Sequence, residues 1–262
     1  MASEQFLAGR GALITGGGRG IGAATARALA SAGAAVTVSA RSKDQIEAVA
    51  EELRQAGHTA HAVACDVSDP EQVEALCAAA AEHMGRVDIL VNNAGIAASA
   101  PLHRETLEQW NRIFAVNVTG VFLCSRAVVS GMLDAGWGRI VNVASVAGKM
   151  GAPYISTYTA SKHAVVGFTR AVAVEVAKKG VTVNAVCPGY VDTEMSDHTV
   201  ETITGKTGMD PAAARKILED MSPQGRIFTA DEVAAQVLHL CAPWSGGVNG
   251  QSLVLDGGAF QA

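Results

Sequence analysis

Short apolar runs alternate along the chain with longer segments whose apolar residues have helical spacing. Most of the short runs are continuously apolar, which is typical of strands buried on both faces of a parallel sheet. They predict strands at Ala12–Thr15, Ala35–Ser39, Thr59–Ala64, Ile89–Val91, Ile140–Ala144, Val181–Val186 and Ser252–Leu255. The intervening segments predict helices at about Ile21–Ala32, Lys43–Ala56, Pro70–Met84, Leu107–Met132, Tyr154–Lys179 and Asp231–Leu240.

This strand–helix–strand order predicts an α/β fold: a doubly wound, Rossmann-type parallel sheet of seven strands with helices on both faces. No linker or low-complexity stretch divides residues 1–262, so we expect a single domain. Its one long irregular segment, 192–228, contains a helical piece at Asp210–Met221. Long insertions near a binding face are often lids, so we interpret this segment as a substrate lid; a surface excursion is the alternative.

Helix boundary signals support these assignments. Ser42 and the Ser68-Asp69-Pro70 run are expected to start helices. Helices are expected to end near glycines, which favour the left-handed conformation that follows a last helical turn. Those glycines are Gly33, Gly57, Gly85 and Gly180.

Composition narrows the functional classes. The 262 residues are 49% hydrophobic and 17% charged, with a net charge of −5, which argues against a disordered chain and against binding to nucleic acid or an anionic membrane. The longest apolar candidate for a membrane span, Ala164–Val176, is broken by Arg170 and Glu175, and the first residues do not resemble a signal peptide. Five scattered cysteines predict reduced thiols and a cytoplasmic protein, and we expect no metal site.

A glycine-rich turn follows the first predicted strand, in the run Thr15-Gly16-Gly17-Gly18-Arg19-Gly20-Ile21-Gly22. Glycines let the backbone turn tightly and approach a diphosphate, and the following helix offers unpaired N–H groups and a partial positive charge. Any tight turn between a strand and a helix favours glycine, but the position of this one predicts a dinucleotide site.

The end of the second strand bears on the choice of cofactor. An NAD site usually has a carboxylate there, about 20 residues after the glycines. This chain has Ser39, Ala40 and Arg41, with no carboxylate before Asp44. Arg41, with Arg19 in the glycine turn, suits a 2′-phosphate and so favours NADP(H); otherwise both are ordinary surface arginines.

Two later strand ends extend this site. Asp66-Val67 follows the third strand, where the carboxylate could accept a hydrogen bond from an adenine amino group. Asn92-Asn93-Ala94-Gly95 follows the fourth strand and is expected to pack under the cofactor and steady the end of the sheet. Taken alone, an Asn-Asn pair more often forms a turn.

Candidate chemistry lies in the second half of the chain. Tyr158 and Lys162 are four residues apart, so a helix places them on one face. A neighbouring ammonium stabilises a phenolate, so we expect Lys162 to lower the pKa of Tyr158 toward neutrality. Ser145, at the end of the fifth strand, could hold a carbonyl oxygen beside that phenol. An exposed Tyr–Lys pair without function is the alternative, and Tyr154 is interpreted as a pocket wall one turn earlier.

As a set, these motifs resemble the short-chain dehydrogenase/reductase family, from Gly11 to Gly258. The resemblance implies that Tyr158 is the general acid or base, that Ser145 orients the substrate oxygen and that Lys162 binds the nicotinamide ribose. It also implies that Asn117, in Asn117-Val118-Thr119-Gly120, supports a proton relay through water. The implied cofactor residues are Gly16, Gly18, Arg19, Gly20, Ile21, Gly22, Ser39, Arg41, Asp66, Val67, Asn93, Ala94, Gly95, Tyr158, Lys162, Pro188, Gly189, Val191 and Thr193.

Within the family, the chain resembles 3-oxoacyl-thioester reductases and polyketide ketoreductases. Two departures argue against a carrier-bound substrate: Ile96-Ala97-Ala98 replaces a Pro-Gly-Gly common in polyketide members, and Ser130 and Val174 align with arginines of carrier-protein reductases. A CoA thioester or a free ketone stays open. The resemblance also implies a homotetramer or homodimer.

The main hypothesis is therefore an NADP(H)-dependent carbonyl reductase. The alternative within the enzyme class is an NAD-dependent secondary-alcohol, steroid or cyclic-alcohol dehydrogenase. The alternative of another class is a non-catalytic dinucleotide-binding regulator on the same fold.

Overall fold

Seven parallel strands form one sheet in the order β3-β2-β1-β4-β5-β6-β7 in the computed structural model, which describes residues 5–261. The strands are β1 (Gly11–Thr15), β2 (Ala35–Ala40), β3 (Ala60–Ala64), β4 (Ile89–Asn92), β5 (Gly138–Val143), β6 (Val181–Pro188) and β7 (Ser252–Leu255). The predicted doubly wound α/β fold is confirmed, and each predicted strand is present with its ends moved by at most two residues.

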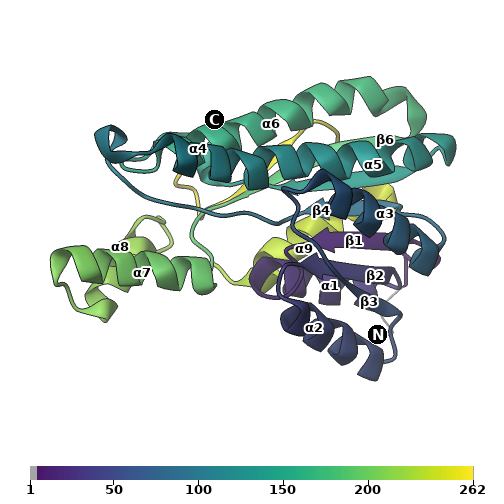
Figure 1. Ribbon diagram of the computed structural model, residues 1–262, viewed down its shortest axis with the longest axis horizontal. Helices are drawn as coiled ribbons and strands as arrows, with labels where there is room; N and C mark the ends of the chain where they lie inside the picture. Colours follow the sequence, from purple (N-terminus) through teal and green to yellow (C-terminus); the bar gives the residue numbers. More distant parts are fainter. Residues whose placement is uncertain (1–4, 262) are drawn as a thin grey trace.

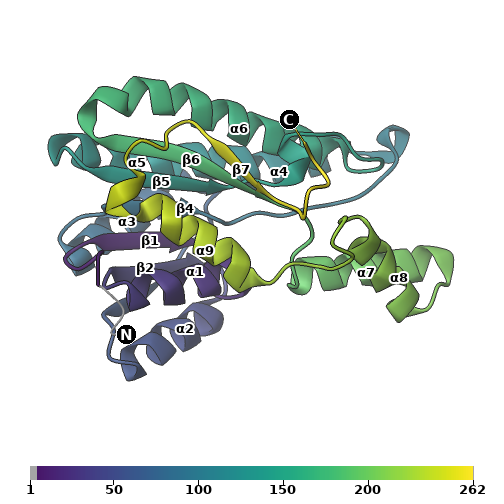
Figure 2. The same cartoon turned by 180° about the vertical axis from the view of Figure 1, so that it is seen from behind.

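Helices cover both faces of this sheet (Figures 1 and 2). They are α1 (Gly20–Ser31), α2 (Lys43–Gln55), α3 (Pro70–Met84), α4 (Leu107–Phe114), α5 (Gly120–Asp134), α6 (Ser156–Val176), α7 (Glu194–Thr207), α8 (Pro211–Asp220) and α9 (Ala230–Cys241). The α1, α2 and α9 helices pack on one face, and α3, α5 and α6 on the other. Both faces of the strands are therefore buried, which explains their continuous apolar sequence.

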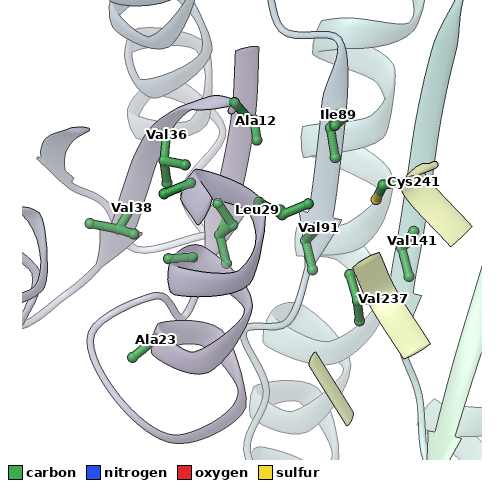
Figure 3. Packing of buried hydrophobic residues seen from close by; sticks show 14 of the residues in the cluster. Ala12, Ala23, Leu29, Val36, Val38, Ile89, Val91, Val141, Val237 and Cys241 are labelled. Carbon is green, nitrogen blue, oxygen red and sulfur yellow. The ribbon is translucent and has the colours of Figure 1, made fainter. Parts of the chain in front are cut away.

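The core between the sheet and α1 is built from small side chains. Figure 3 shows Leu29 of α1 and Val237 of α9 beside strand residues such as Val91 and Val141. Alanines on the buried side of α1, including Ala23, let this helix lie close to the sheet and to α9. This close packing fixes the start of α1, where the glycine-rich turn lies.

The strand register brings polar residues together at one edge. Thr15 at the end of β1 pairs with Ser39 of β2 on one side and with Asn92 of β4 on the other. Asn92 in turn pairs with Asn142 of β5. Because all the strands are parallel, their carboxyl ends form a single polar rim, which is where ligands bind in sheets of this kind.

Two predicted helices differ in detail from the structure. The predicted helix Leu107–Met132 is interrupted by a π-helical turn at Ala115–Thr119, which separates α4 from α5. The predicted helix Tyr154–Lys179 begins only at Ser156 and ends in a 3₁₀ turn at Ala177–Lys179. Tyr154 lies before the helix with a φ of +67°, so it is not one helical turn from Tyr158.

Helix caps were predicted with mixed success. Asp69 caps α3, accepting hydrogen bonds from the backbone N–H groups of Glu71 and Gln72, with Pro70 in the first turn as expected. Ser42 precedes α2, but its side chain forms no capping hydrogen bond. The first turn of α2 instead carries Asp44, whose charge complements the positive end of the helix.

The 192–228 segment projects from the body of the molecule (Figures 1 and 2). It contains two helices, α7 and α8, of which only α8 was predicted, at Asp210–Met221. Arg215 of α8 holds the segment together through ion pairs with Asp192, at 2.9 Å, and Asp197, at 3.8 Å. The segment follows β6, so it stands beyond the carboxyl edge of the sheet.

The continuous helical run Leu107–Asp134 is apolar enough to cross a membrane by length and composition, with a mean hydropathy of 1.7. Within the fold, however, its α5 half packs against α3 and β4 and contributes Leu123, Cys124 and Val128 to the buried core. A buried core helix passes the same test, and the packing supports that interpretation here.

Candidate active site

The glycine-rich turn has the backbone shape that the sequence predicts. Gly16 and Gly20 have positive φ angles of 64° and 51°, which favour glycine. A Cβ on Gly16 would lie 2.8 Å from Nδ2 of Asn93, and one on Gly22 would lie 2.1 Å from the Gly16 carbonyl oxygen. The turn is therefore a tight backbone cradle at the start of α1, a shape that fits a diphosphate.

Hydrogen bonds from the end of β4 hold this turn in place. Asn93 Nδ2 donates to the carbonyl oxygens of Thr15, at 3.1 Å, and Gly16, at 3.0 Å. The Thr15 hydroxyl accepts from the backbone N–H groups of Asn93, at 3.1 Å, and Ala94, at 3.2 Å. The predicted steadying role of the Asn-Asn pair is thus explained, while Thr15 is a participant that the sequence reasoning did not single out.

The ends of β2 and β3 bring the predicted cofactor-selecting residues to the same rim. Arg41 is exposed and forms no ion pair within residues 5–261. Asp66 accepts hydrogen bonds from the backbone and hydroxyl of Ser68, at 3.0 and 2.6 Å. Although partial burial raises the pKa of Asp66, the Ser68 hydrogen bonds and the nearby charge of Arg41 leave it below its usual value. Ser39 is buried, and its hydroxyl has no partner among the described residues.

Apart from Tyr158 and Lys162 on α6, the predicted cofactor residues come from the carboxyl ends of five strands. They are Gly16, Gly18, Arg19, Gly20, Ile21 and Gly22 after β1; Ser39 and Arg41 at β2; Asp66 and Val67 after β3; Asn93, Ala94 and Gly95 after β4; and Pro188, Gly189, Val191 and Thr193 at β6. The Thr193 methyl group lies against the glycine turn, where a Cβ on Gly20 would be 3.1 Å away. Five of the seven strands thus contribute residues to the same rim.

Tyr158 and Lys162 lie on the first turns of α6, beside the ends of β4 and β5. The Lys162 ammonium is 5.7 Å from the centre of the Tyr158 ring and donates a hydrogen bond to the Val143 carbonyl oxygen at 2.9 Å. A Cβ on Gly95 would lie 3.6 Å from Lys162 Nζ, so the lysine lies next to the residues that follow β4. The predicted Tyr–Lys pair is therefore a feature of the rim and not an exposed surface pair.

Ser145 stands opposite this pair, just after β5. Its hydroxyl accepts from the Ala147 N–H at 3.1 Å and so caps a 3₁₀ turn at Val146–Gly148. This cap fixes the side chain at the strand end, where it also interacts with the Tyr158 phenol. Ser145, Tyr158 and Lys162 are thus brought together as the sequence predicts.

The electrostatics of this group differ from the prediction. Burial raises the pKa of Tyr158 to about 12, and the Ser145 hydroxyl opposes that shift only in part. Burial also lowers the pKa of Lys162 to about 8. Lys162 therefore does not lower the Tyr158 pKa in the protein without cofactor, contrary to the expectation. Desolvation is the largest effect on that pKa, and the Lys162 ammonium lies 5.7 Å from the ring centre.

Asn117 lies in the π-helical turn and is fully buried. Its side chain donates to the Ile96 carbonyl oxygen at 2.9 Å and accepts from the Ile96 N–H at 2.9 Å. It also donates to the Ser161 hydroxyl at 3.1 Å, and Ser161 in turn donates to the Tyr158 carbonyl oxygen at 2.7 Å. Single π-helical turns inside α-helices occur frequently at functional sites.

Ser161 is a site residue that sequence reasoning missed. It is fully buried and connects the Asn117 amide to the backbone of Tyr158. Its contact with Asn117 spans 44 residues, so no local pattern reveals it.

No group of three or more His, Cys, Asp or Glu residues suited to a metal ion occurs within residues 5–261. His61 stacks on His83, with ring centres 4.1 Å apart. The five cysteines are all buried and free.

A parallel Rossmann-type sheet, a glycine cradle at the start of α1 and a Tyr–Lys–Ser group at the same rim together define a dinucleotide-dependent oxidoreductase of the single-domain type. Residues 10–204 match the family model described as short chain dehydrogenase, and this chain belongs to that family.

Its relatives include several named reductases and dehydrogenases. The chain is 41% identical over 249 residues to a 3-oxoacyl-[acyl-carrier-protein] reductase of Synechocystis sp., covering 94% of this chain and 95% of that protein. It is 41% identical over 255 residues to cis-4-hydroxycyclohexanecarboxylate dehydrogenase of Sinomonas cyclohexanicum, covering 97% and 98%. A crystal structure of a variant actinorhodin polyketide ketoreductase with NADPH superimposes with a TM-score of 0.92 at 40% identity, covering 95% of this chain and 97% of that one.

Proposed function

We propose that this protein is an NADP(H)-dependent carbonyl reductase that interconverts a ketone and a secondary alcohol. The observation that carries the proposal is the joint placement of Ser145, Tyr158 and Lys162 at the rim that also holds the glycine cradle. The NADPH-bound relative and the unpaired Arg41 at the end of β2 support NADP(H) as the cofactor. When bound, the cofactor supplies the hydride for reduction.

Tyr158 is the proton donor in the reductive direction. Reduction leaves negative charge on the carbonyl oxygen unless a proton arrives with the hydride, so the donor must be protonated at working pH. Because burial raises the pKa of Tyr158 to about 12, the phenol is fully protonated near neutrality. The protonated phenol is the form that the general-acid role requires, whereas the reverse reaction needs the phenolate.

The neighbouring residues position the reacting groups. Ser145, held by its hydrogen bond with the Ala147 N–H, directs its hydroxyl at the substrate oxygen. Lys162 holds the nicotinamide ribose, and its ammonium, freed from strong solvation, attracts the developing oxyanion. Asn117 supports the proton relay from its place in the π-helical turn. A non-catalytic regulator would not need this arrangement.

For the substrate, we propose a 3-oxoacyl thioester or a similar ketone. The relative from Synechocystis, whose name specifies a 3-oxoacyl-[acyl-carrier-protein], supports the 3-oxoacyl group of this class. A cyclic-alcohol dehydrogenase is the second candidate, and the equally similar relative from Sinomonas supports it. The 192–228 segment, which projects beyond the rim, is the proposed lid over either substrate.

The assembly is proposed to be a homotetramer or homodimer. Exposed apolar side chains on α4, α5 and α6, including Trp110, Phe122 and Val174, provide a face suited to a second copy. Val174 is 80% exposed. The cytoplasmic location stays a prediction.

The proton-donor assignment is tested by Tyr158→Phe, which keeps the ring and removes the hydroxyl. General acid catalysis contributes about 10²–10⁴-fold, so turnover of a 3-oxoacyl-CoA should fall at least about 100-fold, while NADPH binding measured by fluorescence persists. Tyr154→Phe is the matched control and should keep most activity, because Tyr154 lies outside α6. Near-normal turnover in Tyr158→Phe would refute the assignment.

The substrate class is tested by comparing 3-oxoacyl-CoA esters with cyclic ketones and cyclic alcohols, each with NADPH or NADH. A higher kcat/KM for the thioester with NADPH supports the first candidate. Preference for a cyclic alcohol with NAD⁺ would favour the second candidate and contradict the cofactor assignment.

A further inference from the structure

An ion pair joins the glycine-rich turn to the base of the 192–228 segment. Arg19 stands directly before α1, and its guanidinium donates to the carboxylate of Glu194, the first residue of α7. The two residues are 175 positions apart in sequence. The Thr193 methyl group meets the same turn, since a Cβ on Gly20 would lie 3.1 Å from it. The first turn of α7 therefore contacts the cradle directly.

Arg19 is also one of the two arginines placed to bind a 2′-phosphate. The other, Arg41, is exposed and forms no ion pair within 4 Å among the described residues, although its charge acts on the nearby Asp66 carboxylate. The two cations of the proposed phosphate site are thus in different states, because one already has an anionic partner. A phosphate that approaches Arg19 must share it with, or displace it from, the Glu194 carboxylate.

On the basis of the proposed NADP(H) function, we infer that Glu194 is a specificity-determining residue for the cofactor, because its carboxylate competes with the 2′-phosphate for Arg19. NAD(H) has no 2′-phosphate and leaves the Arg19–Glu194 pair intact. NADP(H) gains Arg19 only at the expense of that pair. Glu194 therefore weakens the preference for NADP(H) over NAD(H) that Arg19 and Arg41 create.

Other contacts hold the base of α7 independently of this pair, so Glu194 can be changed without loss of the fold. Arg215 binds Asp192 at 2.9 Å, just before the helix. The Ser196 hydroxyl donates to the Val191 carbonyl oxygen at 2.6 Å within the first turn. The Glu194 side chain itself is 60% exposed and packs in no core.

The test is a double-mutant cycle on cofactor binding, with Kd values for NADP⁺ and NAD⁺ measured by calorimetry at low ionic strength. The proteins are wild type, Arg19→Gln, Glu194→Gln and the double variant. An exposed ion pair contributes up to about 1 kcal/mol, so Glu194→Gln should tighten NADP⁺ binding about two- to fivefold and leave NAD⁺ unchanged. In the Arg19→Gln background, the same change should have little effect on NADP⁺.

Glu201→Gln is the matched control, since Glu201 is an exposed carboxylate on the same helix that pairs with His198 and not with the turn. It should leave the NADP⁺ to NAD⁺ ratio unchanged. Equal effects of Glu194→Gln in both backgrounds, or on both cofactors, would overturn the inference, because the carboxylate would then act without Arg19. A wild-type protein that binds neither cofactor would instead refute the proposed function.

Discussion

Replacing Lys162 by methionine should make the cofactor-free protein more stable at pH 7 while abolishing its activity. The lysine side chain is only 6% exposed, and no carboxylate within residues 5–261 stabilises its charge. Burial lowers its pKa from 10.5 to about 8, so the fold disfavours the ammonium form. Methionine has a similar length and no charge, and it therefore removes this unfavourable burial.

The magnitude follows from the pKa shift. Each pKa unit corresponds to about 1.36 kcal/mol, so burying the ammonium costs about 3 kcal/mol at pH 7. Methionine also loses the hydrogen bond from Nζ to the Val143 carbonyl oxygen, which contributes about 0.5–1.5 kcal/mol. The expected net gain in the free energy of unfolding is about 1.5–2.5 kcal/mol.

The gain should depend on pH in a defined direction. Below about pH 8 the lysine is protonated in both the folded and unfolded states, so the full destabilisation is present. Between pH 8 and 10.5 the unfolded state binds more protons, and the stability of the wild type therefore rises with pH. The advantage of Lys162→Met should shrink over this range and be lost above it.

Urea unfolding of wild type and Lys162→Met from pH 6.5 to 10.5, without cofactor, measures the effect. Lys178→Met is the control, because Lys178 is exposed in the 3₁₀ turn after α6, and its stability should stay within about 0.5 kcal/mol of wild type. A Lys162→Met protein that is less stable than wild type at pH 7, with a parallel pH profile, would refute the reasoning.

Two further substitutions test the rest of the site. Arg41→Asp should weaken NADPH binding far more than NADH binding, because it replaces a 2′-phosphate partner with a repelling carboxylate. Titration of cofactor fluorescence measures both Kd values, and an unchanged NADPH to NADH ratio would contradict the proposed role of Arg41. Ser161→Ala should lower kcat about tenfold with little change in the Kd for NADPH, because Asn117 keeps only its Ile96 contacts. Steady-state kinetics and the binding titration separate this positioning role from a general loss of structure, which would change both.

The sheet was predictable from sequence because its physical cause is local. Strands buried on both faces must be apolar at every position, so runs such as Ile140–Ala144 and Val181–Val186 predict them directly. The right-handed crossovers expected between such strands restrict how they can be connected, whereas the order β3-β2-β1-β4-β5-β6-β7 comes from the structure. The glycine cradle was predictable for a similar reason, since Gly16 needs a positive φ that other residues rarely adopt.

Two irregular features beside the site, the π-helical turn at Ala115–Thr119 and the positive φ of Tyr154, have no such local signal in the sequence. The sequence from Leu107 to Met132 keeps an apolar helical pattern through the π-helical turn, and the extra residue at Ala115–Thr119 is stabilised by the contacts of Asn117 with Ile96 and Ser161. Tyr154 has a positive φ because its carbonyl oxygen accepts from the Ala100 N–H at 2.8 Å, in a loop that follows β4. Both features depend on contacts between distant segments.

The pKa values of Tyr158 and Lys162 could not be predicted from the sequence, for a different reason. The four-residue spacing of Tyr158 and Lys162 correctly predicts that they are neighbours, but the sign of the pKa shift depends on how much water each group loses. In the structure desolvation acts on both residues, and it disfavours both the phenolate and the ammonium. The spacing of the two residues indicates only the attraction between their charges. It says nothing about desolvation, which is the larger effect and opposes it.

Lys162 and Arg19 are both cations of the proposed cofactor site, but their surroundings differ. This difference decides how much each one affects the stability of the fold. Lys162 is buried without a counter-charge, so its position lowers stability until a ligand supplies polar partners. Arg19 is exposed and already paired with Glu194, so its position has little effect on stability but hinders a new anion. A buried cation without a counter-charge favours tight and specific contact with a ligand. An exposed, paired cation changes the affinity for a ligand only by small amounts. Selection for function can retain the first against its cost in stability and tune the second through a single carboxylate.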